Sequence, residues 1–81
     1  MAWANPHIGL ELQVPNADGS RSIWRVEGGP PNALFRRGWT RESLQAGTVV
    51  SIRAWPARDG SQRANAHDIT LPDGRVLDAA S

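Results

Sequence analysis

One continuous stretch decides the fold of this chain: Ser22-Ile23-Trp24-Arg25-Val26-Glu27-Gly28-Gly29-Pro30-Pro31-Asn32-Ala33-Leu34-Phe35-Arg36-Arg37-Gly38-Trp39. The two prolines end a strand, because proline has no N–H to donate to a β-ladder. Proline is tolerated in the first turn of a helix, so residues 32–37 are predicted to form one or two helical turns. Gly38 suits the left-handed end of that helix, where Trp39 can pack back onto Leu34 or Phe35 in a Schellman motif.

Hydrophobic alternation predicts strands on either side of this stretch. Residues 7–14 place Ile8, Leu10, Leu12 and Val14 on one face, which is the pattern of a half-buried strand. Residues 21–27, 48–55 and 64–71 are interpreted as further strands, and residues 76–77 as a short last one. The Asp-Gly steps at 18–19, 59–60 and 73–74 indicate tight turns between strands.

The order of these elements predicts an all-β protein with one short helix, folded as a single domain over residues 1–81. A helix after the third strand of a five-stranded barrel is the arrangement of the OB fold, and we expect a small OB-like open β-barrel. One strand is missing from the front of that pattern. Either the barrel stays open, or a second copy of the chain covers the gap, or residues 3–14 form one long bent strand.

Composition excludes several classes of protein. The chain has no cysteine, which rules out disulfides, thiolate zinc sites and cysteine nucleophiles. Nine basic residues, all arginine, are interspersed with eight acidic ones, for a formal net charge of +1. This even distribution disfavours a nucleic-acid partner. No apolar run approaches the roughly 20 residues that cross a membrane, and the sequence does not begin with a signal peptide.

Six motifs follow one another along the chain: Trp3-x-Asn5-Pro6-His7, Trp24-x-Val26-Glu27-Gly28, Pro31-Asn32-x-Leu34-x-Arg36-Arg37-Gly38-Trp39, Leu44-x-x-Gly47, Asp59-Gly60 and Leu71-Pro72-Asp73-Gly74-Arg75. Together they resemble a family of small exported bacterial proteins catalogued only as a domain of unknown function. The resemblance extends from Trp3 to about Leu77, and its long central motif is specific.

The resemblance implies an exported, periplasmic or secreted, β-barrel-like protein with no assigned activity. It also implies a signal peptide, a pair of histidines and a first strand ahead of the Trp-x-Asn-Pro-His motif. This sequence begins inside that motif, so a metal site built from such paired histidines is not expected here. As written, without a signal peptide, the chain is expected to be cytoplasmic.

Candidate binding residues lie in and around the central stretch. The helix and its tryptophans are the expected structural hub and contact surface, through Trp24, Glu27, Asn32, Arg36, Arg37 and Trp39. An ion pair from Glu27 to Arg36 or Arg37 would tie the strand to the helix. Alternatively, Trp24, Trp39 and Trp55 with nearby arginines would stack bases, as in OB folds. The competing interpretation is that these tryptophans fill a core poor in Phe and Tyr.

The chain has two histidines, His7 and His67. If the first and last main strands are neighbours, these side chains could meet with Asp68 or Glu11 and bind copper, nickel or zinc. The competing interpretation is structural: His7 bonds the turn at Asn5-Pro6, and His67 lies on a strand face. Their spacing is not diagnostic of a metal site.

The sequence carries no phosphate loop, nucleophile elbow or thiol, so we expect no enzyme and no cofactor. The leading hypothesis is a non-enzymatic periplasmic-type module that binds an unknown ligand or protein partner. The alternatives are a divalent metal-binding protein using His7 and His67, a single-stranded nucleic-acid-binding OB module, and a homodimer in which a second copy supplies the missing strand.

Overall fold

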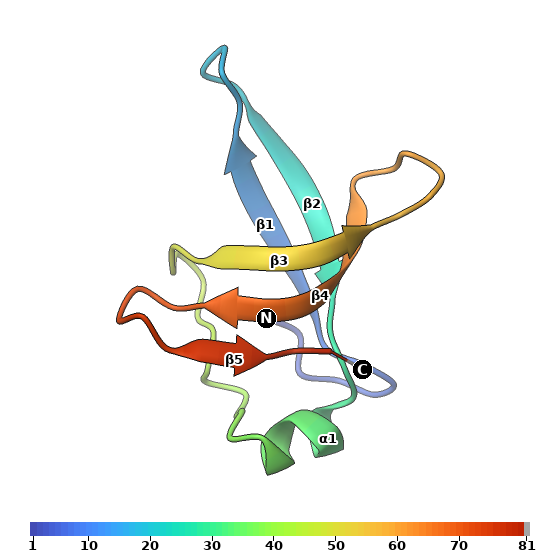
Figure 1. Cartoon of the computed structure of the whole chain (residues 1–81), viewed down its shortest axis with the longest axis vertical. Coiled ribbons are helices and arrows are strands. Elements are labelled where there is room, and N and C mark those ends of the chain that lie inside the picture. The colour runs from blue at the N-terminus through green and yellow to red at the C-terminus, as the bar shows by residue number, and fades with distance from the viewer. Residues whose placement is uncertain (81) are drawn as a thin grey trace.

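The computed structural model describes residues 1–80, which contain five strands and one short helix (Figure 1). The strands are β1 (Gly9–Pro15), β2 (Arg21–Glu27), β3 (Ser51–Pro56), β4 (Arg63–Thr70) and β5 (Val76–Asp78), and the helix α1 (Pro31–Arg36) follows β2. The prediction of an all-β protein with one short helix is therefore confirmed. The predicted element boundaries agree with the observed ones to within three residues.

All five strands belong to one sheet, in the order β1-β2-β4-β3, with β5 paired to β4. β1 and β2 form an antiparallel hairpin, and β4 pairs antiparallel with both β3 and β5. β4 joins the two halves, because its residues 63–65 pair in parallel with the end of β2. In Figure 1 the β1–β2 hairpin runs upward, whereas β3, β4 and β5 lie across its lower part.

The sheet does not close into a barrel, so the predicted OB-like barrel is wrong. β1 and β3 are the outer strands of the path, and no strand in the described range 1–80 connects them. The free edge of β1 carries one isolated bridge, in which Ala2 and Gly9 exchange hydrogen bonds of 2.7 and 3.1 Å. Closure requires the two edge strands to pair, either directly or through a further strand. The segment before β1 provides this single bridge rather than the long bent strand considered above.

The three predicted Asp-Gly turns are confirmed and share one chemistry. Each aspartate, Asp18, Asp59 or Asp73, accepts a hydrogen bond of 2.9–3.0 Å from the backbone N–H two residues later. In each turn, the glycine that follows the aspartate has a positive φ of 80–89°, a conformation that residues with a Cβ disfavour. The Asp-Gly pair therefore supplies both the hydrogen bond and the backbone angle of each turn.

The end of α1 delivers a tryptophan to the core. The N–H of Trp39 donates to the carbonyl of Leu34 at 3.0 Å, and that of Gly38 donates to Phe35 at 3.1 Å. These two bonds, with Gly38 at φ 98°, make the predicted Schellman motif. Leu34 and Trp39 are both fully buried, and the indole Nε1–H donates to the carbonyl of Asp78 at 2.9 Å. The capping motif thus places Trp39 where its indole connects the end of the helix to β5.

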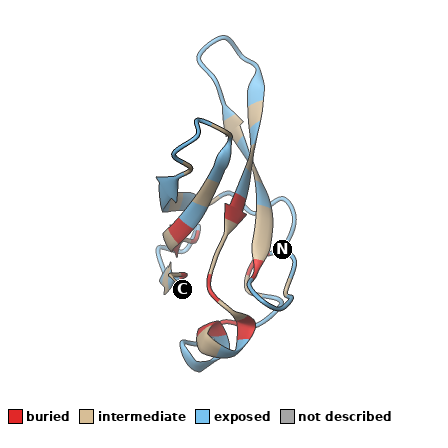
Figure 2. Cartoon of the chain, turned by 90° about the vertical axis from the view of Figure 1, so that its right-hand side faces the viewer, coloured by how far each residue is buried: buried red, intermediate tan, exposed pale blue. Residues whose placement is uncertain are grey.

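The core lies where the lower parts of the strands meet α1 and the segments at the two ends of the chain. Figure 2 shows the buried residues near the helix and the lower parts of the strands, whereas the tip of the β1–β2 hairpin is exposed. The buried hydrophobic residues are Ile8, Val26, Leu34, Trp39, Leu44, Ala66, Ile69, Leu71 and Ala79. Trp3 and Trp24 are partly buried against them.

A close backbone contact at Gly28 and Gly29 joins this core to the chain ends. Gly28 donates to the carbonyl of Ile8 at 3.1 Å, Ile8 donates to Gly29 at 3.1 Å, and Gly29 donates to Ala79 at 2.9 Å. A Cβ added at Gly28 would lie 2.8 Å from Cγ1 of Ile8, whose side chain is fully buried. Glycine is therefore required at position 28 by close approach.

We predict that Trp39→Ala lowers the free energy of unfolding by about 3–5 kcal/mol, because it removes a fully buried indole and leaves a cavity. Chemical denaturation followed by circular dichroism measures this change. Trp55→Ala is the matched control: Trp55 is 55% exposed, and its loss should cost less than about 1 kcal/mol. Equal losses in the two variants would contradict the placement of Trp39 in the core.

We also predict that Gly28→Ala destabilises the protein by about 1–3 kcal/mol, the usual cost of overpacking. The added methyl group would press on the Ile8 side chain and on the carbonyl of Ala79, 3.2 Å away. Gly9→Ala is the control, since a Cβ there meets nothing within 4 Å. A thermal midpoint for Gly28→Ala as high as that of Gly9→Ala would show that Ile8 can move aside.

Candidate functional site

The sheet has an apolar inner face and a polar outer face. Strand pairing places Leu12 opposite Trp24 and Ala54 opposite Ala66 on the inner side. Alternate residues of a strand point to the other side. We call the outward-facing set the outer-face band; its members are Glu11, Arg25, Glu27, Arg53, Trp55, Arg63, Asn65, His67 and Asp68.

Three members of the band form a row across three strands. Glu27 of β2 pairs with Asn65 of β4, and Asn65 pairs with Trp55 of β3. Directly paired residues on neighbouring strands hold their side chains on the same face and within reach of each other. Asn65 and Trp55 are both exposed, so the row presents a carboxylate, an amide and an indole side by side.

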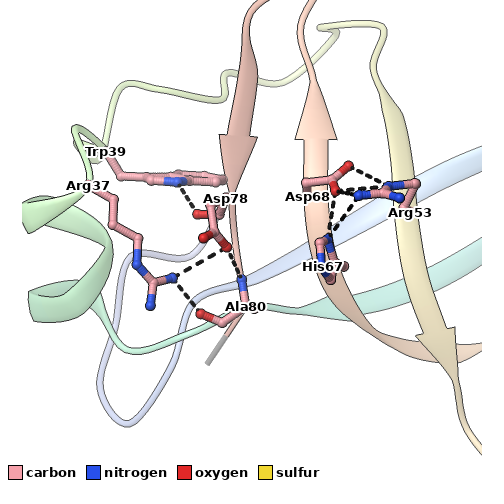
Figure 3. A network of polar contacts seen from close by, with 7 residues as sticks. All are labelled: Arg37, Trp39, Arg53, His67, Asp68, Asp78 and Ala80. Carbon is pink, nitrogen blue, oxygen red and sulfur yellow. Dashed lines mark hydrogen bonds and ion pairs between the residues drawn. The ribbon is translucent and has the colours of Figure 1, made fainter.

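Glu27 also contacts two cationic or titratable neighbours. Its Oε1 lies 3.3 Å from Nη2 of Arg63, and its Oε2 lies 3.7 Å from Nε2 of His7. The ion pair predicted from Glu27 to Arg36 or Arg37 is not formed between the described residues. Arg37 instead lies 3.6 Å from the carboxylate of Asp78 and donates to the carbonyl of Ala80 at 2.6 Å (Figure 3).

The outer face is hollowed on both sides of Glu27. One cleft of about 370 Å³ is lined by Glu27, Gly28, Trp55, Asn65, Ala66 and Ala80. A second, of about 540 Å³, has His7, Glu11, Arg25, Glu27 and Arg63 among its lining residues. A third, of about 170 Å³, shares Glu27 and Asn65 with the first and Glu27 and Arg63 with the second. The three hollows therefore meet at Glu27.

A β-bulge brings two neighbouring residues of β4 to the outer face. The register between β3 and β4 shifts between Arg53 and Ala54, which leaves His67 as the extra residue. His67 Nδ1 lies 2.6 Å from Oδ2 of Asp68. The His67 ring also meets the Trp55 ring edge-on, with 5.1 Å between centroids. A bulge commonly redirects side chains in this way.

Arg53 holds the Asp68 carboxylate from the opposite strand. Its Nε lies 3.2 and 2.9 Å from the two carboxylate oxygens, and its Nη2 contacts Oδ2 as well (Figure 3). Hydrogen bonds from Arg53 and then from His67 lower the pKa of Asp68 from 3.8 to about 2. The buried carboxylate is thus ionised and paired, and it fixes the His67 ring behind Trp55.

The six residues predicted to form one contact surface are dispersed in the structure. Trp39 is fully buried, and Trp24 is half-buried on the inner face, opposite to the face of Glu27. Asn32 and Arg36 are exposed on α1, and Arg37 contacts the C-terminal segment. Of the six, Glu27 alone belongs to the outer-face band.

The three tryptophans of the predicted base-stacking surface also lie apart. Trp39 is in the core, Trp24 packs against it from the inner face, and Trp55 is exposed on the outer face. The interpretation that tryptophans fill the core therefore describes Trp24 and Trp39. It does not describe Trp55.

His7 and His67 have different partners, Glu27 and Asp68 respectively. Among residues 1–80, no three His, Cys, Asp or Glu side chains are grouped so that they could hold a metal ion. The metal-binding alternative therefore gains no support from the described part of the chain. In the same range, none of the helical structure is both long enough and apolar enough to cross a membrane.

Asn65 and Arg63 are members of the band that the sequence interpretation missed. The signal for them is the alternation of Arg63, Asn65 and His67 with Ala64 and Ala66, which places the three polar residues on one face of a strand. Their proximity to Glu27 depends on the parallel pairing of β2 with β4, which no local pattern indicates.

The fold and the site define a small, single-sheet β protein with an open edge and a polar outer face. Residues 1–66 match the model of a family of unknown function (DUF6152). The chain belongs to this family, and the resemblance to a domain of unknown function is confirmed for the motifs from Trp3 to Gly60. Neither a curated protein nor a solved structure matches the chain.

We predict that Asp68 makes the stability of the protein depend on pH. Folding lowers the pKa of Asp68, so the ionised carboxylate contributes to the free energy of unfolding at pH values above about 3.9, the pKa of an unfolded aspartate. That contribution is lost as the pH falls toward the folded pKa of about 2. Urea denaturation should therefore show a difference in the free energy of unfolding between wild type and Asp68→Asn, and this difference should narrow as the pH falls from about 5 to about 2. A difference that stays constant over this range would contradict the ion pair.

Proposed function

We propose that the protein is a non-enzymatic interaction module that binds an extended segment of a partner protein along the free edge of β1. The observation that carries this proposal is that the backbone N–H and C=O groups of Glu11 and Gln13 point away from β2, beside an apolar groove. An exposed sheet edge is a template for a further strand, and strand addition is a recurring mode of peptide recognition.

The hydrogen bonds at Ala2 support this use of the edge. Gly9 exchanges both of its backbone hydrogen bonds with Ala2, on the side of β1 away from β2. Backbone groups along an antiparallel strand alternate in the side to which they point. Those of Glu11 and Gln13 therefore point to the same side as those of Gly9. An incoming strand can pair with them while the β1–β2 ladder stays intact.

The apolar groove lies on the inner face next to this edge. It has a volume of about 240 Å³ and is lined by Leu12, Val14, Trp24, Val26, Ile52, Ala54, Pro56 and Ala64. These residues come from all four strands of the main path, and none of them is charged. Apolar side chains laid into the groove would be stabilised by roughly 25 cal/mol for each Å² removed from water.

The two faces of an added strand define the chemistry of the partner. Side chains that point toward the groove would be apolar, such as Val or Ile. Side chains on the outer face would lie beside Glu11, whose side chain is 60% exposed, and beside Gln13. Glu11 lies 3.4 Å from Arg25 on its β2 side. Its exposed carboxylate can also accept from a lysine or arginine on the added strand, since opposite charges across paired strands are favourable. The proposed partner segment is extended, alternating and basic.

The acetylated peptide Val-Thr-Val-Lys-Val-Thr-Val is the probe of this proposal. We expect the wild-type protein to bind it and to show slower exchange of the Glu11 and Gln13 amide protons in the complex. Gln13→Pro should weaken binding by about tenfold or more, since proline removes the outward N–H and is tolerated at a sheet edge. Hydrogen–deuterium exchange followed by nuclear magnetic resonance measures the first effect, and titration with the peptide measures the second.

Gln13→Ala is the matched control, because it shortens the same side chain and keeps the N–H. The proposal requires this variant to bind the peptide as the wild type does. Equal binding by Gln13→Pro and Gln13→Ala would refute the β1 edge as the docking strand, as would slower exchange confined to β3 or β5.

We also propose an exported, periplasmic or secreted, location for the protein. This location rests on the resemblance of the sequence motifs to a family of small exported proteins, and on no feature of the fold. The nucleic-acid and metal alternatives have no specific observation in their favour, because the residues that they would use lie apart.

A further inference from the structure

We propose a second binding site, independent of the β1 edge: a neutral oligosaccharide binds on the outer face, with Trp55 stacked against a sugar ring and Asn65 and Glu27 bonded to its hydroxyl groups. The site lies on the opposite face of the sheet from the apolar groove. Its three central residues, Trp55, Asn65 and Glu27, are not among the residues through which the partner strand would be held.

Trp55 is the first observation that supports this site. Trp39 is fully buried and Trp3 and Trp24 pack against the core, but Trp55 is 55% exposed. An exposed indole offers a large apolar surface with a polar edge, which matches the apolar face and hydroxyl rim of a sugar. One side of the indole contacts His67, whose ring is held by Asp68. The platform is thus supported by the network in Figure 3.

The cleft beside Trp55 has a suitable size and polar lining. Its volume of about 370 Å³ falls within the range of about 300–1,000 Å³ for small-molecule sites. Glu27 and Asn65 line it together with Trp55, as neighbours in one cross-strand row. A carboxylate accepts hydrogen bonds, whereas an amide both donates and accepts them. These groups can therefore match both roles of a sugar hydroxyl.

The shape of the outer face favours an elongated ligand. The cleft at Trp55 meets two further hollows at Glu27, one of them extending to Arg25 and Glu11. One sugar ring would occupy the cleft at Trp55, and further rings would continue past Arg63. A short chain of sugars therefore fits this surface better than a single ring.

The charge pattern favours a neutral ligand over an ionic one. Each carboxylate of the band is matched with an arginine: Glu11 with Arg25 at 3.4 Å, Glu27 with Arg63 at 3.3 Å, and Asp68 with Arg53. The band therefore has no net charge to attract a phosphate backbone or a polyamine. Stacking and hydrogen bonding, which need no excess charge, remain as the means of recognition.

The test uses the full chain and three neutral probes: cellotetraose, maltotetraose and tetra-N-acetylchitotetraose. We expect at least one of them to shift the indole N–H signal of Trp55, with little change in affinity when salt is raised. Trp55→Ala should weaken binding by about tenfold or more, the effect of removing a stacking platform. Asn65→Ala is a second variant that leaves the indole in place and should also weaken binding.

Phe35→Ala is the matched control, since Phe35 is an exposed aromatic residue, 65% accessible, on α1, and its removal should leave binding unchanged. The absence of any Trp55 shift with all three probes at millimolar concentration would overturn the proposal. Undiminished binding by Trp55→Ala would do the same. Binding of oligothymidine at Trp55 that weakens steeply with salt would replace the saccharide by a nucleic acid.

Discussion

The close contact of Gly28 and Gly29 with Ile8 and Ala79 joins parts of the chain that are far apart in the sequence. Its hydrogen bonds connect the segment before β1, the end of β2 and the segment after β5. The backbones can approach this closely because position 28 has no side chain. The same contact directs the chain out of β2 toward Pro30 and Pro31, and so determines where α1 begins relative to the sheet.

The end of α1 is connected to the C-terminal strand through a single buried residue, Trp39. The Schellman motif is a local structure, but its last residue is Trp39, whose indole donates a hydrogen bond to Asp78 nearly forty residues later. Arg37 reaches the same segment through Asp78 and Ala80. The short helix is therefore held by the C-terminal strand, since six residues are too few for a stable helix on their own.

Local chemistry explains what the sequence could predict. The Asp-Gly turns, the proline-glycine limits of α1 and the alternation of β2 all depend on residues within one turn or strand. Barrel closure, the parallel pairing of β2 with β4 and the contact of Glu27 with Arg63 depend on strands that meet only in three dimensions. Whether Trp55 is exposed was left open for the same reason: alternation separates two faces of a strand but does not indicate which one is covered.

The bulge at His67 shows how the core and the outer face are linked. Before it, the inward residues of β4 have even numbers, Ala64 and Ala66; after it, the inward residue is Ile69. Without the extra residue, either Ala66 or Ile69 would point to solvent, so the core requires the bulge. The same shift turns Asp68 outward beside His67, where the carboxylate is still largely shielded from water. Arg53 on the opposite strand compensates that charge, and the network that orients His67 against Trp55 follows from this requirement of the core.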